Sequence, residues 1–248
     1  MSPRNLLLLS NSTVHGSGYL EWAATPIKEF LASKGVRRVL FVPYALREMD
    51  DYTEKAAKTF TAWGYELSSV HKATDPRRAV SEAEAIFVGG GNTFQLLKTL
   101  YDNKLLEAIR RRVLEASLNM FEGAPYIGSS AGTTWPPSPS TPPTTCPSPT
   151  PLLLGPRPPP LQHQPPLHDA NPATKHMGET REERIRQYHQ LPETPPVLGL
   201  REGSLLRVQL DKVTLHGLHP ARLFRPGKQA EEFPVGTDFH SSSSKTRR

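Results

Sequence analysis

Four short apolar runs, separated by segments with helical periodicity, constrain the fold of this 248-residue chain more than any other feature. Continuous apolar runs are typical of strands that are covered on both faces, as in parallel sheets. The runs lie at residues 6–9, 38–42, 85–88 and 126–127. The helical segments lie at residues 20–33, 50–63, 94–100 and 105–118. Strands that alternate with helices predict an α/β domain, with a parallel sheet flanked by helices.

The C-terminal part follows a different pattern, in which one charged helix precedes several short strands. The helix is expected to open within residues 178–185. The strands are expected at residues 197–200, 205–210 and 213–216. Because the turns at Gly203 and at residues 211–212 are short, they predict antiparallel C-terminal strands.

Residues 135–166 interrupt this organisation. They hold 14 of the 26 prolines, and Arg157 is their only charged residue. Proline lacks the amide donor of a sheet and breaks a helix, so we expect neither a strand nor a helix there. The composition favours a disordered or polyproline-like segment. We therefore expect one domain over residues 1–239, interrupted at 133–167, and a loose tail at 240–248.

Charge and cysteine content narrow the class of protein. The formal charge is +6, but acidic and basic residues are interleaved and no nucleic-acid-binding motif accompanies them, so no nucleic-acid partner is expected. Cys146 is the single cysteine, which excludes an internal disulfide. No apolar run approaches the roughly 20 residues of a membrane span or forms a signal-peptide core. We expect a cytoplasmic protein with no membrane partner.

The stretch Gly128-Ser129-Ser130-Ala131-Gly132 fits the pattern G-x-S-x-G directly after a predicted strand. In this pattern the glycines permit a sharp turn that exposes the middle serine above a sheet, where backbone N–H groups can stabilise an oxyanion. Ser130 holds the middle position and is the candidate nucleophile. A turn of small residues without catalytic function is the alternative.

Three glycines, Gly89 to Gly91, also follow a predicted strand and open a helix. They match neither the dinucleotide fingerprint nor the phosphate loop, so a nucleotide is not indicated. An oxyanion-binding loop beside the serine turn and a simple tight turn are both compatible with the pattern.

A serine nucleophile needs a base, which is usually a histidine oriented by a carboxylate. No local pattern marks one of the histidines that follow Ser130, which are His163, His168, His176, His189, His216, His219 and His240. Arg181 stands near the start of a predicted helix, where a cation is disfavoured by the helix dipole. It could bind a carboxylate of an acidic substrate, or belong to a solvated helix face.

Taken together, these residues resemble the peptidase E (α-aspartyl dipeptidase) family. The resemblance covers about residues 1–134 and 168–239. It is carried by "LLLLSNSTV" at 6–14, "DDYTEKAA" at 50–57, "VGGGNTFQLLK" at 88–98, "YIGSSAG" at 126–132 and "HMGETREERIRQYH" at 176–189. The family implies a class-I glutamine-amidotransferase-like α/β fold, and a serine peptidase that cleaves dipeptides beginning with aspartate. It implies a small peptide as the partner and neither a metal nor a cofactor.

The resemblance assigns roles to individual residues. Ser130 matches the nucleophile, and Arg181 matches the arginine of the motif G-E-T-R that binds the aspartyl side chain. Gly90, Gly91 and the N–H of Ala131 match the oxyanion region. Asn92 falls in the substrate-facing glycine loop.

The remaining catalytic residues of the family are not found at their expected positions. The family aspartate of T-T-N-D-M-P falls at Thr145, and the family histidine of N-I-N-P-H falls at Pro166. His168 lies two residues from the second position and is a possible substitute. From the resemblance we therefore expect an enzyme of this family whose activity is severely impaired.

We hypothesise that residues 133–167 are an out-of-frame reading of the family's coding sequence. With plausible codons, T-T-N-D-M-P-I read one base later gives a first proline and then P-T-T-C-P-S, which is the sequence of residues 143–148. P-F-N-I-N-P-H-Y read two bases later gives L-Q-H-Q-P-P-L, the text of residues 161–167. The two blocks need different frames, so more than one insertion or deletion is required.

Two alternatives remain open. The chain could be an inactive relative that binds an aromatic-lined groove through its proline-rich residues 157–166. It could also be an amidotransferase-like hydrolase of another substrate, although a serine rather than a cysteine at position 130 argues against this.

Overall fold

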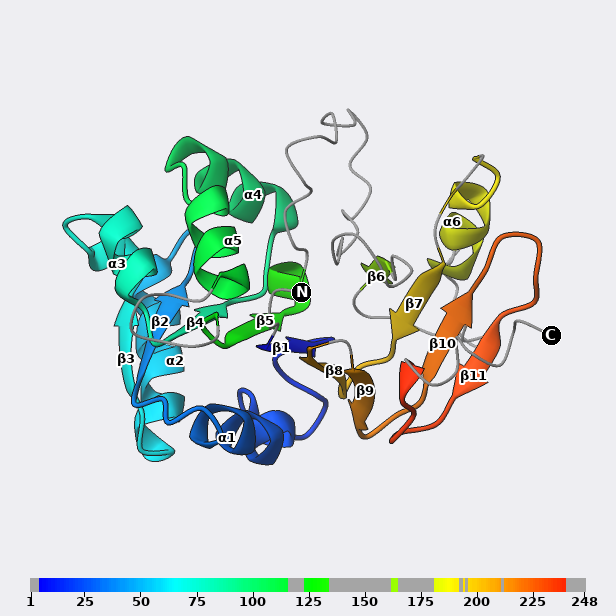
Figure 1. Cartoon of the computed structure of the whole chain (residues 1–248), viewed down its shortest axis with the longest axis horizontal. Coiled ribbons are helices and arrows are strands. Elements are labelled where there is room, and N and C mark those ends of the chain that lie inside the picture. Colours follow the sequence, from blue (N-terminus) through cyan, green and yellow to red (C-terminus); the bar gives the residue numbers. More distant parts are fainter. Residues whose placement is uncertain are drawn as a thin grey trace.

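The structure is a computed structural model. It describes residues 5–115, 123–133, 162–164, 181–191, 194, 196–210 and 212–239, with the backbone alone at 162–164 and 181. The expected α/β architecture is confirmed, because a largely parallel sheet lies between helices and a smaller, largely antiparallel sheet lies beside it (Figure 1).

The main sheet has seven strands in the order β3-β2-β4-β5-β1-β8-β9. Its strands are β1 (Asn5–Leu9), β2 (Arg38–Val42), β3 (Glu66–Ser69), β4 (Ala85–Val88), β5 (Tyr126–Ser129), β8 (Ser204–Gln209) and β9 (Lys212–Gly217). The first five strands in this order are parallel, and β8 and β9 continue the sheet in antiparallel pairing. The apolar runs therefore form the strands that were predicted from them.

Helices cover both faces of this sheet (Figure 1). They are η1 (Glu21–Ala23), α1 (Ala24–Ala32), α2 (Met49–Ala62), η2 (Val70–Lys72), α3 (Pro76–Glu82), α4 (Thr93–Asp102), α5 (Leu106–Leu114) and η3 (Ser130–Thr133). The leucines of β1 alternate between the two cores, since Leu6 and Leu8 pack with α3–α5 and Leu7 and Leu9 pack with α1 and α2. Burial on both faces explains why this strand is continuously apolar.

The smaller sheet has the order β11-β10-β7-β6. Its elements are β6 (Gln162–Gln164), β7 (Val197–Leu200), β10 (Ala221–Phe224) and β11 (Glu231–Phe233), and α6 (Arg181–Tyr188) packs on it. Ile185 of α6 meets Val197 and Phe224 on one face, whereas Leu198 and Leu223 join the core of the main sheet on the other. The predicted charged helix is thus confirmed, with its start at Arg181.

Several elements were not predicted. β3 lies at the edge of the main sheet, and its sequence is mostly polar, so it shows neither an apolar run nor a clear alternation of apolar and polar residues. α3 has only seven residues, and the pair Asp75-Pro76 is the only mark of its start in the sequence. The Asp75 side chain accepts hydrogen bonds from two amides of the first turn, and Pro76 occupies the first helical position, where proline is favoured. β10 and β11 are short and were not recognised.

One expectation about the proline-rich segment is wrong. Residues 162–164 form a strand that pairs in parallel with β7, although no strand was expected between 135 and 166. These residues belong to a four-residue stretch without proline, so their amides can donate to a neighbouring strand. Residues 134–161 and 165–180 and the tail 240–248 lie outside the described residues. Among the described helices, none is long and apolar enough to cross a membrane.

Candidate active site

Two neighbouring strands of the main sheet deliver the candidate catalytic residues to one edge. β4 and β5 are parallel and aligned at Val88 and Gly128, so the glycine loop after β4 lies beside the serine turn after β5. In open α/β sheets, ligands bind in the crevice outside the carboxyl ends of the strands. The position of both loops therefore agrees with a binding role.

Ser130 adopts the left-handed conformation, with φ of +50°, at the first residue of η3. A residue with a β-carbon resists this conformation by about 1–2 kcal/mol, so the surrounding structure must hold it there. The Thr133 hydroxyl donates to the Ser130 carbonyl oxygen at 2.6 Å, and the buried Tyr126 hydroxyl donates to the Gly132 carbonyl oxygen. Ser130 is partly exposed, as a nucleophile must be.

The glycines of this turn are required by the packing of the backbone. A β-carbon at Gly128 would lie 2.3 Å from the Gly132 carbonyl oxygen, and one at Gly132 would lie 2.2 Å from the Val88 carbonyl oxygen. Both separations are far below contact distance. The pattern G-x-S-x-G thus reflects a tight turn between β5 and η3, as predicted.

The glycine loop packs directly against the serine turn. A β-carbon at Gly90 would lie 2.9 Å from the Ser130 β-carbon, so only glycine lets the two backbones approach. Gly91 has φ of +137°, and a β-carbon there would lie 2.7 Å from the Ala45 carbonyl oxygen. Gly90 therefore permits the close approach of the glycine loop to the serine turn, and Gly91 permits its close approach to Ala45.

Tyr52 of α2 fixes the orientation of this loop. Its hydroxyl donates to the Gly90 carbonyl oxygen at 3.2 Å, and burial is the main cause that raises the pKa of Tyr52, so it stays a neutral donor. In a trans peptide the C=O and N–H groups point in opposite directions. The Gly91 N–H therefore points away from Tyr52, and within the described residues neither Gly90 nor Gly91 donates its N–H to a partner.

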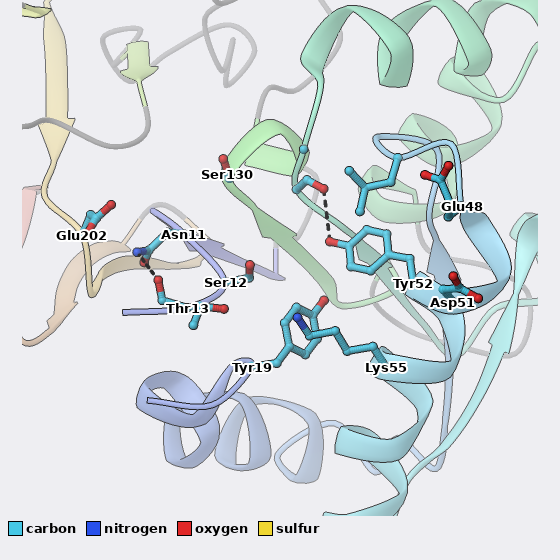
Figure 2. A pocket seen from close by; sticks show the side chains of 13 residues that line it. Asn11, Ser12, Thr13, Tyr19, Glu48, Asp51, Tyr52, Lys55, Ser130 and Glu202 are labelled. Atoms are coloured by element: carbon cyan, nitrogen blue, oxygen red, sulfur yellow. Dashed lines mark hydrogen bonds between the residues drawn. The ribbon is translucent and has the colours of Figure 1, made fainter. Parts of the chain in front are cut away.

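A cavity of about 470 Å³ joins these features, and its size is typical of small-molecule sites. Figure 2 shows Ser130 on one wall and the side chains of α2 on the other. The lining residues are Asn11, Ser12, Thr13, Tyr19, Leu46, Glu48, Asp51, Tyr52, Lys55, Gly90, Gly91, Ser130 and Glu202. Three of them are carboxylates and one, Lys55, is a cation.

Glu202 was not recognised in the sequence. It lies in the turn between β7 and β8, which hydrogen bonds tie to the loop after β1: the Gly203 N–H donates to Asn11 Oδ1 at 3.1 Å, and the Ser10 N–H donates to the Ser204 carbonyl oxygen at 2.9 Å. The signal available in the sequence was Gly203 in a short turn, which has φ of +72°. Glu202 reaches the cavity because β8 pairs with β1, and this pairing could not be predicted from the sequence.

The predicted site residues are brought together only in part. Ser130, Gly90 and Gly91 line one cavity, whereas Ala131, the next residue after Ser130, is buried and does not line it. Asn92 does not line the cavity, because its Oδ1 accepts from the amides of Phe94 and Gln95 and caps α4.

The side chain of Arg181 and the positions expected for the base are not part of the described structure. Arg181 begins α6, which is drawn well apart from β5, the strand that leads into Ser130, in Figure 1. Its side chain lies outside the described residues. Thr145, Pro166 and His168 lie outside them as well. No histidine is among the residues that the structure describes around the cavity.

Comparison with known proteins identifies the family of this chain. Residues 6–146 match the family model described as Peptidase family S51. A probable alpha-aspartyl dipeptidase from Drosophila melanogaster is 44% identical over 256 residues, which cover 96% of this chain and 97% of that protein. A peptidase E from Streptomyces coelicolor is 42% identical and covers 95% of this chain and 93% of its own length.

Two solved structures share the fold. A peptidase from an acI-B1 actinobacterium superimposes with a TM-score of 0.65 at 16% identity, covering 96% of this chain and 97% of that one. A putative peptidase E from Listeria monocytogenes gives a TM-score of 0.57 at 17% identity, covering 88% and 100%. The matched family model, the long high-identity alignments and the shared α/β fold lead to one conclusion: this chain belongs to peptidase family S51, a family of hydrolases.

Proposed function

We propose that the reaction of this site is the hydrolysis of dipeptides that begin with aspartate, with Ser130 as the nucleophile. The observation that carries the proposal is the left-handed Ser130 turn packed against the glycine loop within one cavity. The substrate class is supported by the relatives named alpha-aspartyl dipeptidase and peptidase E, which align over nearly the whole chain.

In the proposed reaction, Ser130 Oγ attacks the carbonyl carbon of the N-terminal aspartate and forms an ester bond. Its proton passes to a base and then to the amine that leaves as the peptide bond breaks. The oxyanion is held by N–H groups of Gly90, Gly91 and Ala131. Water then hydrolyses the ester, which releases aspartate and restores the serine.

Arg181 is proposed to bind the side-chain carboxylate of the substrate, since a guanidinium pairs well with a carboxylate. This role requires α6 to present Arg181 to the cavity that contains Ser130. Asn92 is proposed to act indirectly, by capping α4 and holding the end of the glycine loop.

The base is the missing part of the proposed machinery. The family positions for the aspartate and the histidine are Thr145 and Pro166, neither of which can accept the serine proton at neutral pH. Glu202 lines the cavity with Ser130 and is the candidate for a carboxylate that orients an imidazole there. We therefore propose that the chain as it stands hydrolyses its substrate very slowly.

The first test is a pair of assays with the substrate Asp-Leu. One protein is the present chain, and the other, the restored chain, has residues 133–167 replaced by the in-frame family text. We expect rapid hydrolysis by the restored chain, none after Ser130→Ala, and a rate near background for the present chain. Rapid Ser130-dependent hydrolysis by the present chain would contradict the impairment, and an inactive but folded restored chain would contradict the substrate class.

The frame hypothesis has its own test. Gene and transcript are sequenced across the codons for residues 130–170. Shifted frames that restore T-T-N-D and N-P-H would support it. The frame hypothesis would be rejected if the transcript encodes the proline-rich sequence and the gene has no insertion or deletion relative to the genes of related proteins.

A further inference from the structure

Lys55 is the one cation among the described residues that line the cavity. It extends from α2, the same helix that supplies Tyr52 to the glycine loop. Its ammonium group lies over the ring of Tyr19, 5.0 Å from the ring centroid, which is within the range of a cation–π contact. Because Tyr19 also lines the cavity, this contact holds the ammonium group of Lys55 at the cavity wall.

The charge of Lys55 is available to a ligand. Within the described part of the chain Lys55 forms no ion pair, although Glu48 and Asp51 line the same cavity. Figure 2 shows that the ammonium group points toward Tyr19, whereas the carboxylates of Glu48 and Asp51 lie beyond Tyr52. The neighbouring Asp50 is instead paired with Lys72 and His71, on the other side of the first turn of α2.

We propose that Lys55 binds the free α-carboxylate of the second residue of the substrate. The inference rests on the proposed dipeptidase function and deepens it. A dipeptide carries its carboxylate one residue beyond the carbonyl that Ser130 attacks, and a cation at the far wall of the cavity is the complementary group. No other cation is found among the described lining residues.

This role would make Lys55 a determinant of substrate length. In a tripeptide or a longer peptide the same position holds a neutral amide, which gains nothing from the ammonium group. The aspartyl side chain and the α-carboxylate are both anionic, so the role of Lys55 must be separated experimentally from that of Arg181.

Binding is measured by calorimetry in the Ser130→Ala background, where hydrolysis cannot interfere and a missing base does not matter. The probes are Asp-Leu, its C-terminal amide, and Ala-Leu. Lys55→Met should weaken the binding of Asp-Leu about fivefold, which is the upper end of the range for a solvent-accessible ion pair, and leave the binding of the amide unchanged. Lys55→Arg should keep most of the affinity.

Lys58→Met is the matched control, because Lys58 is exposed on the same helix and does not line the cavity. It should leave all three affinities unchanged. An equal loss for Asp-Leu and its amide after Lys55→Met would overturn the proposal and assign Lys55 to the aspartyl side chain. If the Ser130→Ala protein with Lys55 intact bound Asp-Leu and its amide equally, the role of Lys55 would be overturned, but the proposed function would not. If that protein bound neither peptide, the proposed function would be overturned as well.

Discussion

The Tyr52 hydroxyl donates to the Gly90 carbonyl oxygen, so a helix on one face of the sheet fixes a peptide in the candidate oxyanion loop on its edge. In the restored chain, Tyr52→Phe should lower kcat for Asp-Leu about tenfold through misplacement of the Gly91 N–H, while KM stays nearly constant. A change confined to KM would argue against this positioning role. Steady-state kinetics make the distinction, and thermal unfolding checks that the variant is folded.

The left-handed conformation of Ser130 predicts a trade between stability and function. Ser130→Gly should be about 1 kcal/mol more stable than Ser130→Ala, because only glycine adopts φ of +50° without strain. Urea unfolding of the two variants measures the difference, and neither should hydrolyse Asp-Leu. Equal stabilities would show that the turn stores no strain.

The serine turn should be intolerant of a single methyl group. Gly132→Ala would place a β-carbon 2.2 Å from the Val88 carbonyl oxygen, so we expect a loss of more than about 2 kcal/mol in the free energy of unfolding. Gly16→Ala is the control, because Gly16 has φ of +80° but open space around it, and should cost only about 1 kcal/mol. Similar losses at the two positions would contradict the steric explanation.

Asn92 is expected to act through its cap. Asn92→Ala should remove the acceptor for two amides of α4 and lower stability by about 1 kcal/mol. Asn92→Asp keeps an acceptor oxygen and should restore most of the stability and, in the restored chain, most of the activity. An Asp variant that is stable but inactive would instead point to direct contact with the substrate.

Stability should fall as the pH drops through the range of histidine titration. Burial first, then Arg207, lowers the pKa of His216, and burial also lowers the pKa of His189. The unfolded chain then binds the proton more readily, so stability is fully present above the unfolded pKa of about 6.5 and is lost below it. Urea unfolding at about pH 7.5 and about pH 5.5 measures the loss. His216→Gln should reduce it, and an unchanged loss would exclude this residue.

The parallel core could be predicted from the sequence because each strand there is apolar on both faces. The four runs that were identified correspond to β1, β2, β4 and β5. The missed elements lack such a signal. Glu66–Ser69 is polar and joins the edge of the sheet, and Gln162–Gln164 forms a strand only because β7 offers it a partner.

The site shows the same division. The serine turn and the glycine loop could be predicted, since a backbone held this tightly demands glycine at fixed positions in the chain. Tyr52, Lys55 and Glu202 could not be assigned, because they reach the cavity from α2 and from the turn before β8, far from Ser130 in sequence. Only the pairing of strands and the packing of α2 bring them to one place.

The place of β1 in the main sheet has a consequence for incomplete chains. β1 lies between β5 and β8, so the C-terminal strand pair shields one edge of Asn5–Leu9, a strand of consecutive leucines. A polypeptide that stopped before Ser204 would leave this edge unpaired, as a template on which further copies could stack. Premature termination of synthesis should therefore produce insoluble aggregates in the cell, and not merely a silent enzyme.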